Sequence, residues 1–348
     1  MGWHANRRTQ PCHVAAGDGV SVGTDSARGE VRGLAEGPNG HFWAATSGGG
    51  VHHGSLEELA PLTGVPALDR SPFLSAGLRM TRGDLYFAGP TQVFRREAGT
   101  GVVRTLPMAG ETVTALCEDA DGSLLLGTRE GMLKRMADGV VQPVPNGNFS
   151  SPVVAIVRGK RPGVWVATVS AGLFHWDSGN VEHWTTAEGL PTNLLRSLHE
   201  DAEGTLWIGT GGGGLAWLRD GRVQVADTRR GLMNDAISPI LEDDDGNLWL
   251  GSIRGISRIS KRELFDVAAG RAAAVHPLAL DESDGMPSAE CTSGYCPAGI
   301  RSQSGLLLFS TTRHIVAVDP KRFTSATTPP NMLIESVIAC RKIVRASC

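Results

Sequence analysis

The chain has 348 residues, of which 41% are hydrophobic and 20% charged, and its formal net charge is −3. Such a balanced composition implies no basic face, so nucleic acid is a poor partner. No stretch approaches the ~18 consecutive apolar residues that a membrane-spanning helix needs. Glycine is frequent, at 45 residues, without any low-complexity run, which favours an all-β fold with many tight turns.

The first residues do not have the pattern of a signal peptide. Arg7 and Arg8 are basic, but no apolar segment follows them. The sequence therefore shows no signal peptide and no membrane segment, although a trimmed N-terminus would look the same.

One phrase recurs down the chain. It occurs at 34–46 and 116–128 and is clearest at 198–210 and 241–252, while looser copies lie at 78–89, 156–168 and 300–311. The equivalent positions are 46, 89, 128, 168, 210, 252 and 311, so the spacings are 43, 39, 40, 42, 42 and 59. A period near 40 made of short strands predicts the blades of a β-propeller.

Each unit divides into four strands. In the clearest copy these are predicted at 195–200, 205–209, 215–218 and 222–226, with an acidic turn ending in Gly204 after the first strand and a Gly-rich turn after the second. Trp207 in the second strand is interpreted as a packing residue between neighbouring sheets rather than as a ligand platform.

We therefore predict an all-β fold, a seven-bladed β-propeller with four-stranded blades, over residues 1–328. The blade cores are expected near 31–54, 75–96, 113–135, 153–176, 195–219, 237–259 and 298–320. The seventh copy has only three strands before the Pro-rich stretch at 327–330, and a ring must hide its edges. Residues 10–16 resemble the fourth strand at 222–226, so we expect them to form the outer strand of the last blade.

Several motifs are better explained by structure than by chemistry. His199 stands in a phrase like a histidine-kinase phosphoacceptor box, but it falls in a strand. The run 243–246 is a turn rather than a calcium loop, which would need more oxygen ligands from a longer segment. No catalytic order and no zinc-type spacing occur, so we predict no catalytic residue, no metal and no cofactor. Cys291 and Cys296 could form a disulfide or remain two unpaired thiols.

Residues 31–320 resemble the two-component regulator propeller repeat, whose blades read Glu-Asp-x-x-Gly-x-Leu-Trp-Ile-Gly-Thr-x-x-Gly-Leu. The connectors at 188–193, 231–234 and 284–290 resemble the phrases between blades of that family, and residues 329–337 resemble the start of the Ig-like domain that normally follows. The resemblance makes 329–348 the truncated start of that domain, or a tail.

The resemblance implies a periplasmic or otherwise extracytoplasmic sensor of bacterial two-component signalling. Its expected partners are a small-molecule ligand, which could be an oligosaccharide, and the Ig-like and kinase or regulator domains of a full-length sensor. Dimerisation is left open. The alternatives are a propeller lyase or hydrolase of the streptogramin-lyase type, or a protein-interaction scaffold; we expect the chain not to be an enzyme.

Connectivity suggests where a ligand would bind. The turns after strand two and the blade-to-blade connections share one face, which has the longer and more variable segments. Polar side chains there could hydrogen-bond hydroxyls or a carboxylate near the central channel. The candidate ligand-binding residues on this face are Arg129, Ser170, Asn193, Asn234, Arg254 and Glu290.

Overall fold

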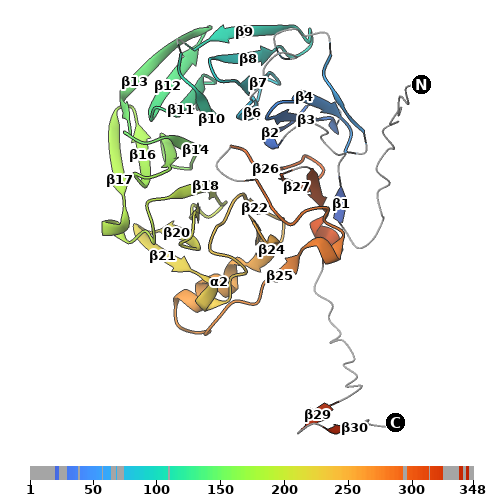
Figure 1. Ribbon diagram of the computed structural model, residues 1–348. Helices are drawn as coiled ribbons and strands as arrows, with labels where there is room; N and C mark the ends of the chain where they lie inside the picture. The colour runs from blue at the N-terminus through green and yellow to red at the C-terminus, as the bar shows by residue number, and fades with distance from the viewer. Residues whose placement is uncertain are drawn as a thin grey trace, which may run out of the picture.

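The computed structural model describes residues 20–348, with gaps at 23–29, 38–39, 57, 64–67, 69–73, 109, 293–295, 313, 324–336, 340–341 and 345–348, and without the side chains of 20–22 and 337–348. Figure 1 shows its sheets around a central axis, with one edge strand of each sheet innermost. The described strands form seven four-stranded antiparallel sheets and a separate two-stranded hairpin. The predicted seven-bladed β-propeller is confirmed.

The first four blades follow the chain in order. Their strands are β2 (Val31–Glu36), β3 (Phe42–Thr46), β4 (Gly50–Gly54) and β5 (Leu59–Pro61) in blade 1; β6 (Ala76–Arg79), β7 (Leu85–Ala88), β8 (Gln92–Arg96) and β9 (Val103–Pro107) in blade 2; β10 (Val113–Glu118), β11 (Leu124–Thr128), β12 (Met132–Ala137) and β13 (Val140–Asn148) in blade 3; and β14 (Val153–Arg158), β15 (Val164–Thr168), β16 (Leu173–Asp177) and β17 (Asn180–Trp184) in blade 4.

The last three blades carry the exceptions to the repeat. Their strands are β18 (Leu195–Glu200), β19 (Leu206–Thr210), β20 (Leu215–Arg219) and β21 (Arg222–Ala226) in blade 5; β22 (Ile240–Glu242), β23 (Asn247–Ser252), β24 (Gly255–Ser260) and β25 (Leu278–Leu280) in blade 6; and β26 (Gly299–Arg301), β27 (Leu307–Ser310) and β28 (Ile315–Val318) in blade 7, joined there by β1 (Val20–Val22). The helix α2 (Lys261–Ala268) is inserted between β24 and β25. The separate hairpin is β29 (Val337–Ala339) with β30 (Lys342–Val344).

The N-terminal part of the chain closes the ring, as expected, but with a different segment. Val20 pairs with Val318 and Val22 with Val316, so β1 is the outer strand of blade 7. The prediction that residues 10–16 form this strand was therefore wrong, and those residues lie outside the described part of the chain.

The core lies between the blades. Seven clusters of buried apolar side chains occur among the described residues, one at each junction of neighbouring blades. Trp207 and Trp249 are fully buried in two of these junctions, which confirms that the strand-two tryptophan is a packing residue.

The repeated threonine at the end of strand two holds the following turn. In blade 5 the Thr210 hydroxyl donates to the Gly214 carbonyl oxygen at 2.7 Å and accepts from the Gly213 amide at 2.8 Å. Gly214 has a φ of +82°, and a Cβ there would lie 2.1 Å from the carbonyl oxygen of Ala226. Only glycine fits this position, because the left-handed conformation and the close backbone both exclude a side chain.

Candidate functional site

A ring of charged residues surrounds one mouth of the central channel. In six blades the last residue of strand one pairs with the first residue of strand two, next to the turn that joins them, and in blade 6 Glu242 pairs with Leu248, the second residue of β23. In order around the ring these residues are Glu36, Arg79, Glu118, Arg158, Glu200, Glu242 and Arg301.

Three of the glutamates connect their blade to the preceding one. Glu118 accepts from the Thr81 amide at 2.7 Å, Glu200 accepts from the Lys160 amide at 2.8 Å, and Glu36 accepts from the Gln303 amide at 2.7 Å. Each of these amide donors is the second residue after the charged ring residue of the preceding blade. These three carboxylates thus already accept hydrogen bonds from the backbone of the propeller.

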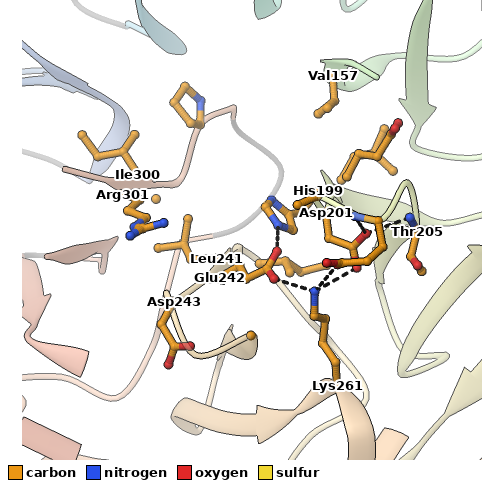
Figure 2. Close-up of a pocket in the computed structure, with 18 of the residues that line it drawn as sticks. Val157, His199, Asp201, Thr205, Leu241, Glu242, Asp243, Lys261, Ile300 and Arg301 are labelled. Carbon is orange, nitrogen blue, oxygen red and sulfur yellow. Dashed lines mark hydrogen bonds and ion pairs between the residues drawn. The ribbon is translucent and has the colours of Figure 1, made fainter. Parts of the chain in front are cut away.

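Glu242 departs from this pattern. Its carboxylate lies 3.0 Å from His199 Nε2 and 2.6 Å from Lys261 Nζ. Lys261, the first residue of α2, also contacts Asp201 at 3.2 Å and Glu203 at 2.7 Å (Figure 2). The inserted helix therefore places one ammonium group among three carboxylates at the channel mouth.

The electrostatics of this cluster follow from its contacts. Burial alone would raise the pKa of the Asp201 carboxyl, but hydrogen bonds from Trp207, Thr205 and Lys261 outweigh burial and hold the pKa below its ordinary value. Burial would likewise raise the pKa of the Glu242 carboxyl. Hydrogen bonds from His199 and Lys261 outweigh burial, so this pKa also lies below its ordinary value. The carboxylates raise the pKa of Lys261 in spite of its burial. Lys261 is therefore protonated and serves as a counter-ion, not as a nucleophile.

The acidic turns after strand one fasten the tryptophans of strand two. Asp201 Oδ2 accepts from the Trp207 indole at 2.9 Å, and Asp243 Oδ2 accepts from the Trp249 indole at 2.8 Å. Asp243 also accepts from the amides of Asp245 and Asn247 within its own turn. Its role as a turn residue, expected from the sequence, agrees with these contacts.

A cavity of about 1110 Å³ opens at this mouth. Its walls come from the first strands of blades 2 to 7 and its rim from the turns that follow them. The apolar wall includes Leu78, Leu116, Ile156, Val157, Leu198, Ile240, Leu241 and Ile300. The rim includes Glu118, Arg158, His199, Glu200, Asp201, Glu203, Glu242, Asp243, Lys261 and Arg301, and Figure 2 shows Arg301 across the cavity from the Lys261 cluster. An apolar interior with a polar entrance is the usual form of a small-molecule site.

The connection into blade 7 crosses the channel axis. Cys296 packs against the clusters between blades 3 and 4 and between blades 4 and 5, while the Pro297 carbonyl oxygen accepts from the Leu34 amide of blade 1 at 3.3 Å. Both residues line the cavity together with the deeper wall residues. They therefore form the inner end of the cavity.

The six candidate residues from the sequence lie at the opposite ends of the strands, and none of them lines this cavity. Backbone hydrogen bonds bring their segments together in pairs, because each turn after strand two contacts the next connection. Thus Gly172, in the turn of Ser170, donates to the Asn193 carbonyl oxygen at 3.2 Å, and Cys291, next to Glu290, donates to the Ser252 carbonyl oxygen in the turn of Arg254 at 3.0 Å.

The side chains of three of these six residues, Asn193, Asn234 and Ser170, form local hydrogen bonds. Asn193 accepts from the Thr186 amide at 2.9 Å, Asn234 accepts from the Ala236 amide at 2.7 Å, and the Ser170 hydroxyl lies 3.0 Å from that of Ser151. Arg129 and Arg254 stand in the turns after strand two, where their amides donate to Thr112 and Ser252. A ligand role for this set stays a prediction.

Sequence reasoning missed the residues of the cavity. The strand-one glutamates were visible as part of the acidic phrase, but that phrase was assigned to turn formation. The contact of Lys261 with Asp201 joins residues 60 positions apart in the sequence, and no local pattern reveals it.

The described residues include three cysteines. Cys117, Cys291 and Cys296 are free thiols, and Cys291 is buried in the junction of blades 6 and 7, away from the clusters that Cys296 contacts. In the described residues no group of three or more His, Cys, Asp or Glu side chains is placed to hold a metal ion. No described helix has the length and apolarity to cross a bilayer.

The sequence pattern of the family described as "two component regulator propeller" matches residues 189–212 and 231–254. These segments contain the first two strands of blades 5 and 6, where the Asp–Trp pairs lie. The chain therefore contains two-component regulator propeller repeats in these two blades. None of the curated proteins searched matches it.

Solved structures share the fold of this repeat protein at low sequence identity. The extracellular domain of the hybrid two-component system BT3049 from B. thetaiotaomicron superposes with a TM-score of 0.75 at 18% identity, covering 96% of this chain and 46% of that one. Virginiamycin B lyase from Staphylococcus aureus gives 0.64 at 12% identity, covering 86% and 98%. The WD40 propeller of Doa1 gives 0.60 at 15%, covering 85% and 95%. The chain spans less than half the length of the two-component domain.

Proposed function

We propose that this repeat protein is the ligand-binding sensor propeller of a bacterial two-component system, acting outside the cytoplasm, and that its ligand binds in the channel cavity. The repeat belongs to the two-component regulator family, and the structure of BT3049 is described as an extracellular domain of a hybrid system. In a full-length sensor the propeller would act with Ig-like and kinase or regulator domains.

The cavity is the observation that carries the assignment of the site. Its volume of about 1110 Å³ is at the upper end of ordinary ligand pockets. The aliphatic wall can cover the apolar face of a ligand, while the rim offers groups that hydrogen-bond hydroxyls, above all Arg158 and Arg301. A small carbohydrate, which has both kinds of surface, fits this combination.

One contact favours a second candidate function. His199 and Glu242 form a histidine–carboxylate pair within the cavity, and such a pair is the arrangement of a general base with an orienting group. A propeller lyase is therefore the alternative. Turnover of a bound compound that is lost in His199→Gln would favour the lyase, and binding without turnover favours the sensor.

The site is tested by filling it. Neutral and acidic oligosaccharides and small metabolites are screened by thermal shift, and any compound that stabilises the protein is titrated calorimetrically. Val157 points into the cavity and is half-buried (Figure 2), so Val157→Phe should occupy ligand space and weaken binding by about tenfold or more.

The matched control lies on the opposite face. Arg129→Ala combined with Arg254→Ala should leave the affinity unchanged. If this pair abolishes binding while Val157→Phe does not, the ligand binds at the face predicted from the sequence and the cavity assignment is wrong.

A further inference from the structure

Two thiols line the inner end of the cavity. Cys117 is the fifth residue of β10 and is 8% exposed, while Cys296 reaches the cavity from the connection that crosses the channel. Cys296 packs against the apolar cluster between blades 3 and 4, to which Cys117 belongs. Side chains from distant parts of the sequence thus share one packed cluster.

The inner strand of blade 4 lies beside both thiols. The Arg158 amide on β14 is within hydrogen-bonding reach of the Cys117 sulfur, and the Ile156 amide is within reach of the Cys296 sulfur. These amides are two residues apart, so they face the same edge of the strand at a separation of about 6.6 Å. The Cys117 thiol also donates to the Glu118 carbonyl oxygen at 3.6 Å.

We propose that Cys117 and Cys296 form a disulfide when the protein folds in an oxidising compartment, and that this bond ties the cross-channel segment to blade 3. The bond requires the two side chains to rotate about their Cα–Cβ bonds until the sulfur atoms lie about 2.05 Å apart. The thiol form described above is then the reduced state.

The bond fixes the inner end of the cavity. The cross-channel segment has few backbone partners in the described residues, such as the Pro297–Leu34 contact. A covalent link to β10 would hold this wall of the cavity in one place. The inference goes beyond ligand binding and does not depend on which ligand the cavity takes.

The oxidant is a second disulfide, such as oxidised glutathione. The Cys296 thiolate attacks one of its sulfur atoms, the S–S bond of the oxidant breaks, and one glutathione leaves as a thiolate that takes up a proton. The Cys117 thiolate then attacks the Cys296 sulfur and expels the second glutathione. Two protein thiols are oxidised to one disulfide, and one glutathione disulfide is reduced to two thiols.

The order of attack follows from exposure. Burial raises the pKa of Cys117 to about 12 and that of Cys296 to about 11, and Cys296 is the more exposed of the two. The thiolate fraction rises about tenfold per pH unit below these values, so oxidation of the folded reduced protein should be slow at pH 7 and much faster at pH 9.

Peptide mapping tests the bond directly. The full chain is unfolded, refolded in a buffer of oxidised and reduced glutathione so that equilibrium decides the outcome, alkylated in denaturant and digested. Because Tyr295 lies between the candidates, cleavage after it separates Cys291 from Cys296. We expect a linked pair of peptides carrying Cys117 and Cys296, lighter by two hydrogens than the reduced pair.

Variants identify the partners. The link should persist in Cys291→Ser and disappear in Cys117→Ser, and reductant should lower the Tm of the wild-type protein by about 5 °C or more but not that of Cys117→Ser. Recovery of both cysteines as alkylated thiols, or a link from Cys291 to Cys296, overturns the proposal.

Discussion

The strand-two tryptophan is hydrogen-bonded within its own blade in blades 5 and 6 but to the neighbouring blade in blade 4. In blade 5 the acceptor for the Trp207 indole is Asp201, six residues away in the same blade. In blade 4 the corresponding position is Gly159, and the Trp165 indole donates at 2.8 Å to Glu200 of the next blade. A local bond in one blade is replaced by a bond across a junction in the other.

The glycine makes the second arrangement possible. A Cβ at position 159 would lie 2.1 Å from Glu200 Oε2 and 2.9 Å from Trp165 Nε1, so a side chain there would collide with the bond itself. The loss of an aspartate in blade 4 is thus matched by space for a carboxylate from blade 5. A blade that departs from the repeat can therefore keep its buried tryptophan hydrogen-bonded by using a carboxylate of the neighbouring blade.

The largest effect is expected where the local bond also supports the turn. Asp201 accepts from the Glu203 and Thr205 amides and from the Trp207 indole, and it contacts Lys261. Asp201→Ala leaves the buried Thr205 amide and Trp207 indole without this acceptor and should cost about 3 kcal/mol of unfolding free energy, measured in urea.

Asp243→Ala is the matched control for that variant. Asp243 holds its tryptophan and turn in the same way, but among the described residues it forms no ion pair with a lysine. We expect a smaller loss. Equal losses would mean that Lys261 adds nothing to the blade 5 arrangement.

The second effect concerns the Lys261 ammonium group, which the helix inserted in blade 6 supplies. Lys261→Met removes the cation from between Asp201, Glu203 and Glu242, of which Asp201 is almost fully buried. Since uncompensated buried charges are costly, the loss should be about 2 kcal/mol at pH 7. Lys261→Arg, which keeps the charge, should lose less.

The stability that this cluster provides depends on pH. The pKa values of Asp201 and Glu242 are lower in the folded protein than their ordinary values of about 4. Their contribution to stability is therefore present above about pH 4 and is lost as the pH falls through the folded values. Lys261→Met should flatten the acid limb of the stability curve, and an unchanged acid limb would contradict the role given to the lysine.

The same contrast explains what could be predicted from the sequence. The blades were predictable because Trp207, Thr210 and Gly214 act within one unit, so their spacing repeats with the fold. The closing strand was predicted at residues 10–16 but is Val20–Val22, since its partner β28 lies about 300 residues away along the chain. The contacts of Lys261 and Cys296 likewise join distant segments, so the local spacing of residues does not predict them.

The smallest effect is expected at the junction of blades 4 and 5. Glu200→Ala removes the acceptor of the Trp165 indole and of the Lys160 amide. Since the amide is exposed and can turn to water, the loss should be about 1 kcal/mol in urea unfolding. Glu118→Ala, which also loses an amide contact to the preceding blade but no indole, should cost less.

Transplanting the blade 5 arrangement sharpens this result. With Glu200 shortened to alanine, position 159 has room for a side chain, and Gly159 does not occupy the left-handed region. Gly159→Asp in the Glu200→Ala background should give Trp165 a local acceptor and recover part of the lost stability, whereas Gly159→Asp alone should destabilise the protein through its clash with Glu200. If the double variant is no more stable than Glu200→Ala, the two arrangements are not interchangeable, and the glycine in blade 4 has a role beyond making room for the neighbouring carboxylate.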